Sequence, residues 1–158
     1  MKKYELTEET KVIGGKTLFR IRALRSFGGI KAGDLGGFIE NERNLSHGGN
    51  AWVGGNAEVY GNAQVVGYAQ VGGNARVGGD GLINSNNDYL CEQGLGSRNR
   101  SASFFKCKDG HIHVLCGCFS GNLDEFENKV KEEHGNSKYS KEYLGFIEVV
   151  KTHFEVRQ

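Results

Sequence analysis

The stretch from Gly49 to Asn84 constrains the fold most, because it repeats a six-residue unit without interruption. Read in sixes it is GNAWVG, GNAEVY, GNAQVV, GYAQVG, GNARVG and GDGLIN. The first five units keep Gly first, Ala third and Val fifth, and the last keeps the frame with Gly81 and Ile83 in the Ala and Val places. A fixed short period is typical of chains that wind into stacked coils. The repeat therefore predicts a β-helix.

Each Ala-x-Val triplet is expected to form a short strand whose first and third side chains point to the same face. Gly and Asn then turn the corner, because both tolerate left-handed backbone conformations. The residues expected to face inward are Ala51, Ala57, Ala63, Ala69, Ala75, Val53, Val59, Val65, Val71 and Val77.

This pattern resembles the hexapeptide-repeat left-handed β-helix, in which three units make one triangular coil. The resemblance implies that residues 18 apart stack, which places Glu58 under Arg76 and Trp52 under Gln70. The repeats supply only about two coils, so we expect self-association to bury more of the hydrophobic column, with a trimer favoured. Trp52 occupies an outward position, which indicates an interface or a contact with a cap.

The whole sequence predicts a mainly β protein with a smaller α+β part. Composition changes along the chain mark four segments: an N-terminal β cap, a short left-handed parallel β-helix, a connector rich in turn formers and a C-terminal ββαα domain. Their expected ranges are 1–47, 48–84, 85–100 and 101–158.

The cap is expected to contain a hairpin, in which residues 4–13 pair with the alternating run 17–25 across Gly14-Gly15. Running the six-residue frame backwards puts Ile39 and Leu45 in the Ala places, so irregular coils are expected to begin near Gly37. A cap is needed because an open β-helix end leaves backbone groups unpaired.

The C-terminal segment reads as a hairpin followed by two helices. Lys108-Asp109-Gly110 joins two alternating runs, 101–107 and 111–116. The first helix is expected after Asn122, with Glu125 as capping-box partner, and closes at Gly135; the second starts near Ser140. The expected buried face of the hairpin is Phe105, Cys107, Ile112, Val114 and Cys116.

Composition excludes several classes of function. The formal net charge of +1 gives no electrostatic case for bulk nucleic-acid or anionic-membrane binding. No run approaches the roughly 18 apolar residues of a membrane-spanning helix, and the charged N-terminus does not read as a secretory signal. Four cysteines are too few for a disulfide framework in a chain of this length. We therefore expect a reduced, cytoplasmic protein.

Two loops are candidates for binding an anion. The loop 96–100 follows Gly96 with Ser97, Asn99 and two arginines, and the loop 116–121 leads into a helix N-terminus. The hairpin between them is expected to bring them together, with aromatic side chains nearby, in a pocket suited to a nucleotide-like ligand. The alternative is a loop junction whose Gly and Ser residues only cap the elements. The candidate ligand-binding residues are Ser97, Arg98, Asn99, Arg100, Phe104, Cys116, Gly117, Cys118, Phe119, Ser120, His134, Tyr139 and Tyr143.

Two other groups of polar residues, the arginines of the cap and the Cys and His residues of the C-terminal segment, are interpreted as structural. Arg20, Arg22 and Arg25 could clamp a phosphate, but a solvated face paired with nearby glutamates is favoured. A metal set drawn from Cys107, His111, His113, Cys116, Cys118 and His134 lacks paired C-x₂₋₄-C knuckles. Because His111 and His113 are expected opposite Cys116, structural thiols are favoured. We assign no metal, no cofactor and no catalytic residue.

The chain is also similar to known phage sequences. The pattern KYELTEET, GGKTLFRIRALRSFG and the GNA-x-V repeats resemble small phage and prophage proteins often described as hexapeptide transferases. The stretches GSRNRSASFFK and CGCFSGNLDEFENKVKEEHGNSKYSKEY resemble a short phage domain found after such repeats or on its own. No activity is established for this family.

The resemblance implies action inside an infected bacterium. We expect a non-enzymatic oligomeric protein that inhibits host defence by sequestering a nucleotide-derived immune signal. Two alternatives stay open: a hexapeptide-repeat acyltransferase with His47 as its histidine, and a protein-binding inhibitor or virion part with an exposed apolar patch.

Overall fold

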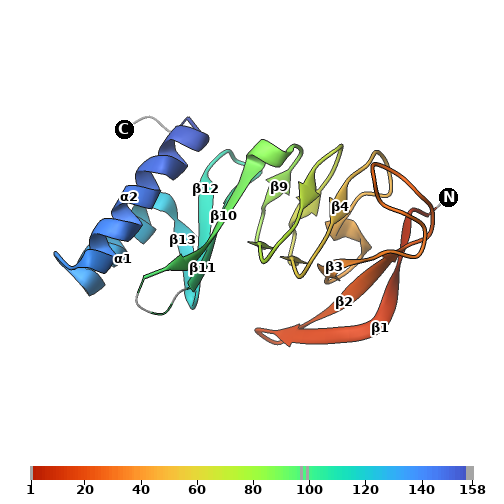
Figure 1. Cartoon of the computed structure of the whole chain (residues 1–158), viewed down its shortest axis with the longest axis horizontal. Helices are drawn as coiled ribbons and strands as arrows, with labels where there is room; N and C mark the ends of the chain where they lie inside the picture. Colours follow the sequence, from red (N-terminus) through yellow and green to blue (C-terminus); the bar gives the residue numbers. More distant parts are fainter. Residues whose placement is uncertain (1, 97, 99, 156–158) are drawn as a thin grey trace. The chain divides into compact units, whose positions relative to one another are not determined.

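The computed structural model describes residues 2–96, 98 and 100–155, and it divides into two compact units, Met1–Asn86 and Asn87–Gln158. The chain is mainly β, with several open sheets and two helices, both of which belong to the second unit (Figure 1). Among the described residues, no helix is both long enough and apolar enough to span a membrane.

The first unit contains nine strands and one short 3₁₀ helix among its described residues. The strands β1, β2, β3, β5 and β8 form one sheet in that order, and the pairs β4–β7 and β6–β9 form two further sheets. The elements are β1 (Tyr4–Ile13), β2 (Lys16–Ala23), β3 (Leu35–Ile39), η1 (Glu42–Asn44), β4 (Trp52–Val53), β5 (Glu58–Val59), β6 (Gln64–Val65), β7 (Gln70–Val71), β8 (Arg76–Val77) and β9 (Leu82–Ile83).

The repeat units stack at the predicted interval. Trp52 pairs with Gln70 and Glu58 with Arg76, both in parallel register, so the 18-residue spacing is confirmed. All ten alanines and valines predicted to face inward are at most 1% exposed. The Gly that opens each unit has a positive φ, between 55° and 66°, which explains why this place in the repeat requires glycine.

The prediction for Ile39 and Leu45 is wrong by two residues in the repeat frame. Ile39 pairs with Val59 and Leu45 with Val65, so both occupy the Val places and not the Ala places. The cause is a longer loop: Leu45 precedes Val53 by eight residues, where the regular repeat would allow six. An irregular layer does begin at β3, but at an offset of 20 residues from the layer above it.

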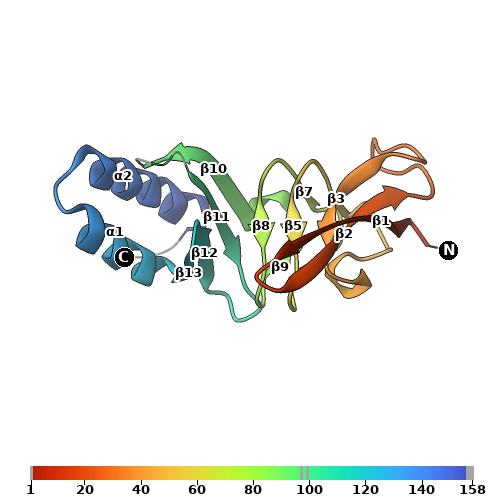
Figure 2. The same cartoon turned by 90° about the horizontal axis from the view of Figure 1, so that it is seen from below.

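The cap forms the predicted hairpin and covers the tryptophan. β1 and β2 pair antiparallel around Gly14-Gly15, and Figure 2 shows them beside β3. Trp52 is only 4% exposed, since the rings of Tyr4 and Phe27 meet it edge-on at 6.5 Å and 5.3 Å. The outward tryptophan is therefore a cap contact.

The second unit is larger than the predicted ββαα domain. Its four strands form one antiparallel sheet in the order β10-β11-β12-β13, and both helices lie on one face of that sheet (Figures 1 and 2). The expected connector 85–100 thus contains a strand, and the loop after the hairpin contains another. The elements are η2 (Asn86–Asp88), β10 (Tyr89–Leu95), β11 (Arg100–Lys106), β12 (Ile112–Cys116), β13 (Phe119–Asn122), α1 (Leu123–His134) and α2 (Lys138–His153).

The first helix begins and ends as predicted. The Asn122 side chain accepts from the Glu125 N–H at 2.8 Å, and the Glu125 carboxylate accepts from the Asn122 N–H at 3.0 Å. Gly135 closes the helix with a φ of 54°. The second helix starts at Lys138 with Ser137 as its N-cap, slightly earlier than expected. Local capping chemistry therefore determines both helix starts.

All five hairpin residues predicted to be buried are buried, but Phe105 and Cys107 do not share a face with the other three. Phe105 pairs directly with His113, while Phe104 pairs with Val114, so Phe104 and not Phe105 shares the helix-facing core with Val114. Cys107 belongs to the Phe105 face, because the three residues 108–110 form the loop and Cys107 donates its backbone N–H to the His111 carbonyl at 2.9 Å. Directly opposed residues of an antiparallel pair share a face.

Lys3 is a fully buried lysine in the cap. Its Nζ donates to the carbonyl oxygens of Ala51 and Gly48 and lies 4.9 Å from the centre of the Phe27 ring. Burial, with a smaller contribution from the nearby Arg25 charge, lowers the pKa of Lys3 to about 8. The charged ammonium is therefore less favourable in the folded chain than in the unfolded chain.

This pKa predicts how stability depends on pH. Between about pH 8 and pH 10.5 the unfolded chain holds more protons at Lys3 than the folded chain, so the free energy of unfolding rises with pH. Urea unfolding at about pH 7 and about pH 9 measures the rise, and Lys3→Met is the control because it cannot titrate. From pH 7 to pH 9, the free energy of unfolding should rise more for the wild-type chain than for Lys3→Met. Equal rises would contradict the lowered pKa of Lys3.

Candidate functional site

A cavity of about 960 Å³ lies within the second unit. This volume is within the range that small-molecule pockets occupy, roughly 300–1,000 Å³. Its walls come from the start of β11, the loop between β12 and β13, and the facing sides of α1 and α2. The residues that line it are Arg98, Arg100, Cys116, Cys118, Phe119, Ser120, Phe126, Lys129, Val130, Glu133, His134 and Tyr143.

Most of the candidate ligand-binding residues meet at this cavity. Those that line it are Arg98, Arg100, Cys116, Cys118, Phe119, Ser120, His134 and Tyr143. Phe104 does not, because it is 0% exposed in the core under the helices. Tyr139 contacts His134, with ring centres 6.4 Å apart, but is not part of the lining. Ser97 and Asn99 lie outside the described residues.

The sequence interpretation missed the contribution of α1. Phe126, Lys129, Val130 and Glu133 all line the cavity and follow one another at helical spacing toward His134. The helical spacing could have indicated these residues. His134 was already a candidate, and residues three and four apart lie on the same side of a helix.

Aromatic rings form one wall of the cavity. His134 stacks on Tyr143, with ring centres 5.6 Å apart and planes 20° apart, and Phe126 meets Tyr143 edge-on at 5.7 Å. The Tyr143 hydroxyl donates to the Leu95 carbonyl at 3.3 Å. Burial, together with the neighbouring Cys116, raises the pKa of Tyr143 to about 12. Tyr143 is therefore neutral near pH 7, and its ring is held for stacking.

The charged side chains of the lining are mainly cationic. Lys129 pairs with Glu133 at 3.3 Å. Arg98 is exposed and Arg100 half-buried, and within the described part of the chain neither forms an ion pair with a carboxylate. A guanidinium group presents a planar fork of donors that matches phosphate or carboxylate. The pocket thus offers two such forks beside an aromatic wall.

The position of Arg100 depends on Gly117. A Cβ atom at Gly117 would overlap the Arg100 guanidinium group, and the φ of Gly117 is +58°. Glycine is therefore needed there for its backbone conformation, and an added Cβ would force the flexible Arg100 side chain to move. The close approach attaches the β12–β13 loop to the start of β11, as expected for the two candidate loops.

His47, the candidate acyltransferase histidine, is part of the cap. Its ring stacks on Tyr4 with centres 4.1 Å apart, its Nδ1 accepts from the Lys3 N–H at 3.1 Å, and its Nε2 contacts the Glu42 carboxylate at 2.8 Å. That last contact also lowers the pKa of Glu42. Both ring nitrogens are engaged, which favours a structural role.

The three arginines of the cap are engaged as well. Arg20 pairs with Glu9 at 2.9 Å and Arg22 with Glu5 at 2.5 Å. Arg25 donates to the His47 carbonyl at 3.3 Å. The pairing with glutamates agrees with the structural interpretation for Arg20 and Arg22, although only Arg22 is exposed to solvent.

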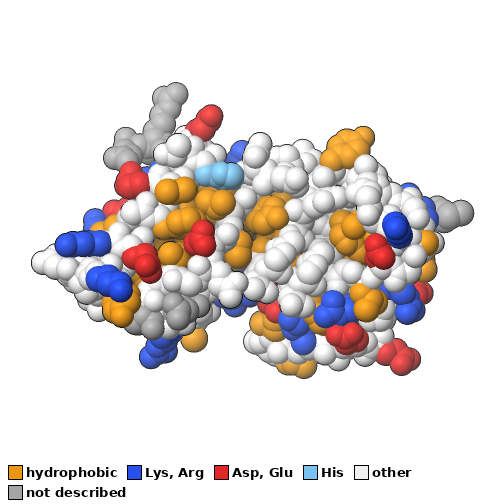
Figure 3. All heavy atoms as spheres, in the orientation of Figure 1, with side chains coloured by type: hydrophobic (Ala, Val, Ile, Leu, Met, Phe, Trp, Pro, Cys, Tyr) orange, Lys and Arg blue, Asp and Glu red, His pale blue; other side chains and the backbone are white. Residues whose placement is uncertain are grey.

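Hydrophobic side chains also reach the surface of the second unit. Figure 3 shows them gathered over α2 and β10, next to acidic side chains. Leu90, Phe146 and Phe154 are partly buried and pack against the core of this unit. They form the outer edge of that core and do not line the cavity.

No family model matches the chain, and no curated protein is significantly similar to it. Function is therefore inferred from the residues of the cavity.

The contact between Gly117 and Arg100 predicts a coupled mutational effect. Gly117→Ala should lower stability by the cost of a left-handed alanine, about 1–2 kcal/mol, and further by the overlap with Arg100. Gly79→Ala is the matched control, because Gly79 has a similar φ of +55° but open space around it. The extra loss of stability is the amount by which Gly117→Ala lowers the free energy of unfolding beyond the control substitution. Urea unfolding should show that this extra loss disappears when Arg100 is also replaced by Ala. An unchanged extra loss would show that Arg100 does not lie against this loop.

Proposed function

We propose that this protein is a non-enzymatic binding protein for a small, anionic, nucleotide-like molecule. The observation that carries the proposal is the pair Arg98 and Arg100, without carboxylate partners among the described residues, beside the His134–Tyr143 stack in a cavity of about 960 Å³. Cationic forks and the aromatic wall together match the two parts of a nucleotide, its phosphates and its base.

Each part of the lining has a role in this proposal. The two guanidinium groups bind phosphate oxygens, and Lys129 adds positive charge that Glu133 partly offsets. The half-buried Phe119 and the His134 ring offer faces on which a base stacks. Cys116 and Ser120 complete the lining between β12 and β13, although the Ser120 hydroxyl itself is hydrogen-bonded to His113. No group in the lining is assigned a catalytic step.

The resemblance to phage proteins supplies the biological context of the proposal. In that context the ligand is a nucleotide-derived immune signal, and the protein sequesters it in the cytoplasm of an infected bacterium. We further propose that the repeat region is a left-handed parallel β-helix of about two coils that joins identical chains, with a trimer favoured. The 18-residue parallel pairing supports this geometry, since three six-residue sides make one coil.

Calorimetric titration of the pure protein with cyclic mono-, di- and trinucleotides and with ADP-ribose derivatives tests the proposal. At least one compound should bind, and Arg98→Gln and Arg100→Gln should each weaken it by roughly 10–100-fold, because each removes a charge-assisted hydrogen bond. Recovery of the unchanged compound after denaturation is expected for a binding protein.

Arg22→Gln is the matched control, because Arg22 is an arginine of the cap that pairs with Glu5. It should bind like the wild-type protein. Absence of binding to every compound in the panel, or equal losses in the Arg22 and Arg100 variants, would contradict the proposed site.

A further inference from the structure

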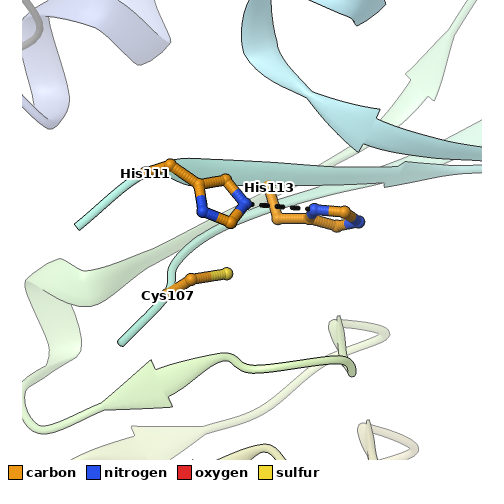
Figure 4. Close-up of side chains that lie close together, drawn as sticks. All are labelled: Cys107, His111 and His113. Atoms are coloured by element: carbon orange, nitrogen blue, oxygen red, sulfur yellow. Dashed lines mark hydrogen bonds between the residues drawn. The ribbon is translucent and has the colours of Figure 1, made fainter. Parts of the chain in front are cut away.

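A cluster of potential metal ligands lies at the tip of the β11–β12 hairpin, apart from the residues that line the cavity. One ligand atom from each of Cys107, His111 and His113 lies within 4.8 Å of the other two. Figure 4 shows the two imidazole rings next to each other, with the Cys107 sulfur directed into the space beside them. Cys107 is buried, His113 is half-buried and His111 is exposed.

The hairpin register places these three side chains together. The Cys107 backbone N–H donates to the His111 carbonyl across the loop, and Phe105 pairs with His113. Cys107, His111 and His113 therefore lie on one face of the sheet. Cys116 is on the opposite face, in the core against the helices. Cys116 is therefore separated from the two histidines by the sheet, whereas Cys107 lies on their side of it.

The spacing of the two imidazoles fits a tetrahedral ion. The Nε2 atom of His111 and the Nδ1 atom of His113 are 3.4 Å apart. Two nitrogens bound to tetrahedral zinc at about 2.0–2.1 Å are about 3.3–3.4 Å from each other. A thiolate sulfur at about 2.3 Å from the same ion would lie about 3.6 Å from each nitrogen, which a small rotation of the Cys107 side chain would reach.

The second nitrogen of each of the two imidazole rings lies within hydrogen-bond distance of a side-chain oxygen. His111 Nδ1 contacts the Asp109 carboxylate at 2.5 Å, and His113 Nε2 contacts the Ser120 hydroxyl at 2.9 Å. A carboxylate only accepts, so His111 Nδ1 carries the proton and its Nε2 presents a lone pair toward His113. Metal-ligating histidines typically donate their second N–H to an oxygen in this way.

We propose that Cys107, His111 and His113 form a binding site for a zinc-type transition-metal ion. One thiolate and two neutral imidazoles are the ligand types that zinc prefers, while calcium and magnesium prefer oxygen. Three protein ligands leave the fourth position to water or a further ligand, and the exposed His111 gives solvent access to the cluster. The ion would tie the tip of β11 to β12.

Cobalt titration of the full-length, reduced, chelator-stripped protein tests the site. Co²⁺ should bind with one equivalent per chain and give the visible bands of a tetrahedral ion together with a thiolate-to-cobalt charge-transfer band. Added Zn²⁺ should displace it. Cys107→Ser should abolish the charge-transfer band, and His111→Ala should weaken binding at least tenfold. Asp109→Asn should weaken it by about 10–100-fold, because Asp109 holds the ligand ring.

Cys118→Ser and His153→Ala are the controls, since both residues lie outside the cluster. They should bind cobalt like the wild-type protein. His111 is exposed, so circular dichroism should report an unchanged fold for His111→Ala. Failure to bind one equivalent, a charge-transfer band that survives Cys107→Ser, or a band lost in Cys118→Ser would each overturn the proposal.

Discussion

The three-residue loop 108–110 is the constraint on which both candidate sites depend. It sets Cys107 opposite His111, and this register decides the face of every side chain along β11 and β12. Phe104 and Cys116 thereby face the helices, where the cavity forms, while Cys107 and His113 face the other way, where the ligand cluster forms. A loop one residue shorter or longer would exchange the two faces, because strand side chains alternate.

The first unit depends on a different constraint, the stacking of equivalent residues of the repeat on one another. Repeat units 18 residues apart pair in parallel, so that Val53 lies over Val71, and their backbone groups hydrogen-bond: the Trp52 N–H donates to the Ala69 carbonyl at 3.0 Å. The column is short, and its first layer is irregular, so the cap closes it with Tyr4, Phe27 and the buried Lys3. A short stack of repeat units with such a cap agrees with the proposed role of an oligomerisation stem.

Local chemistry in the sequence was sufficient for part of this structure. The six-residue period predicted the stacking, and Asn122 with Glu125 predicted the start of α1. The convergence of Arg100 and Cys118 followed from loops at the same end of one hairpin. The predictions that failed depend on contacts between residues far apart in the sequence. The eight-residue step before Val53 shifted the frame of Leu45, and β10 depends on pairing with β11, which its own residues do not indicate. An Asp-Gly turn is compatible with loops of two or three residues, so the face of Cys107 needed the structure.

The proposed function requires that the second unit holds a small anionic molecule in the cavity between its sheet and its helices. Native mass spectrometry of the protein isolated from infected bacteria tests this requirement, because it reports the assembly and its cargo together. We expect a homo-oligomer that carries an added small-molecule mass, and denaturation should release that molecule intact with its phosphate groups. Bare chains with no added mass, from cells that produce the signal, would contradict it.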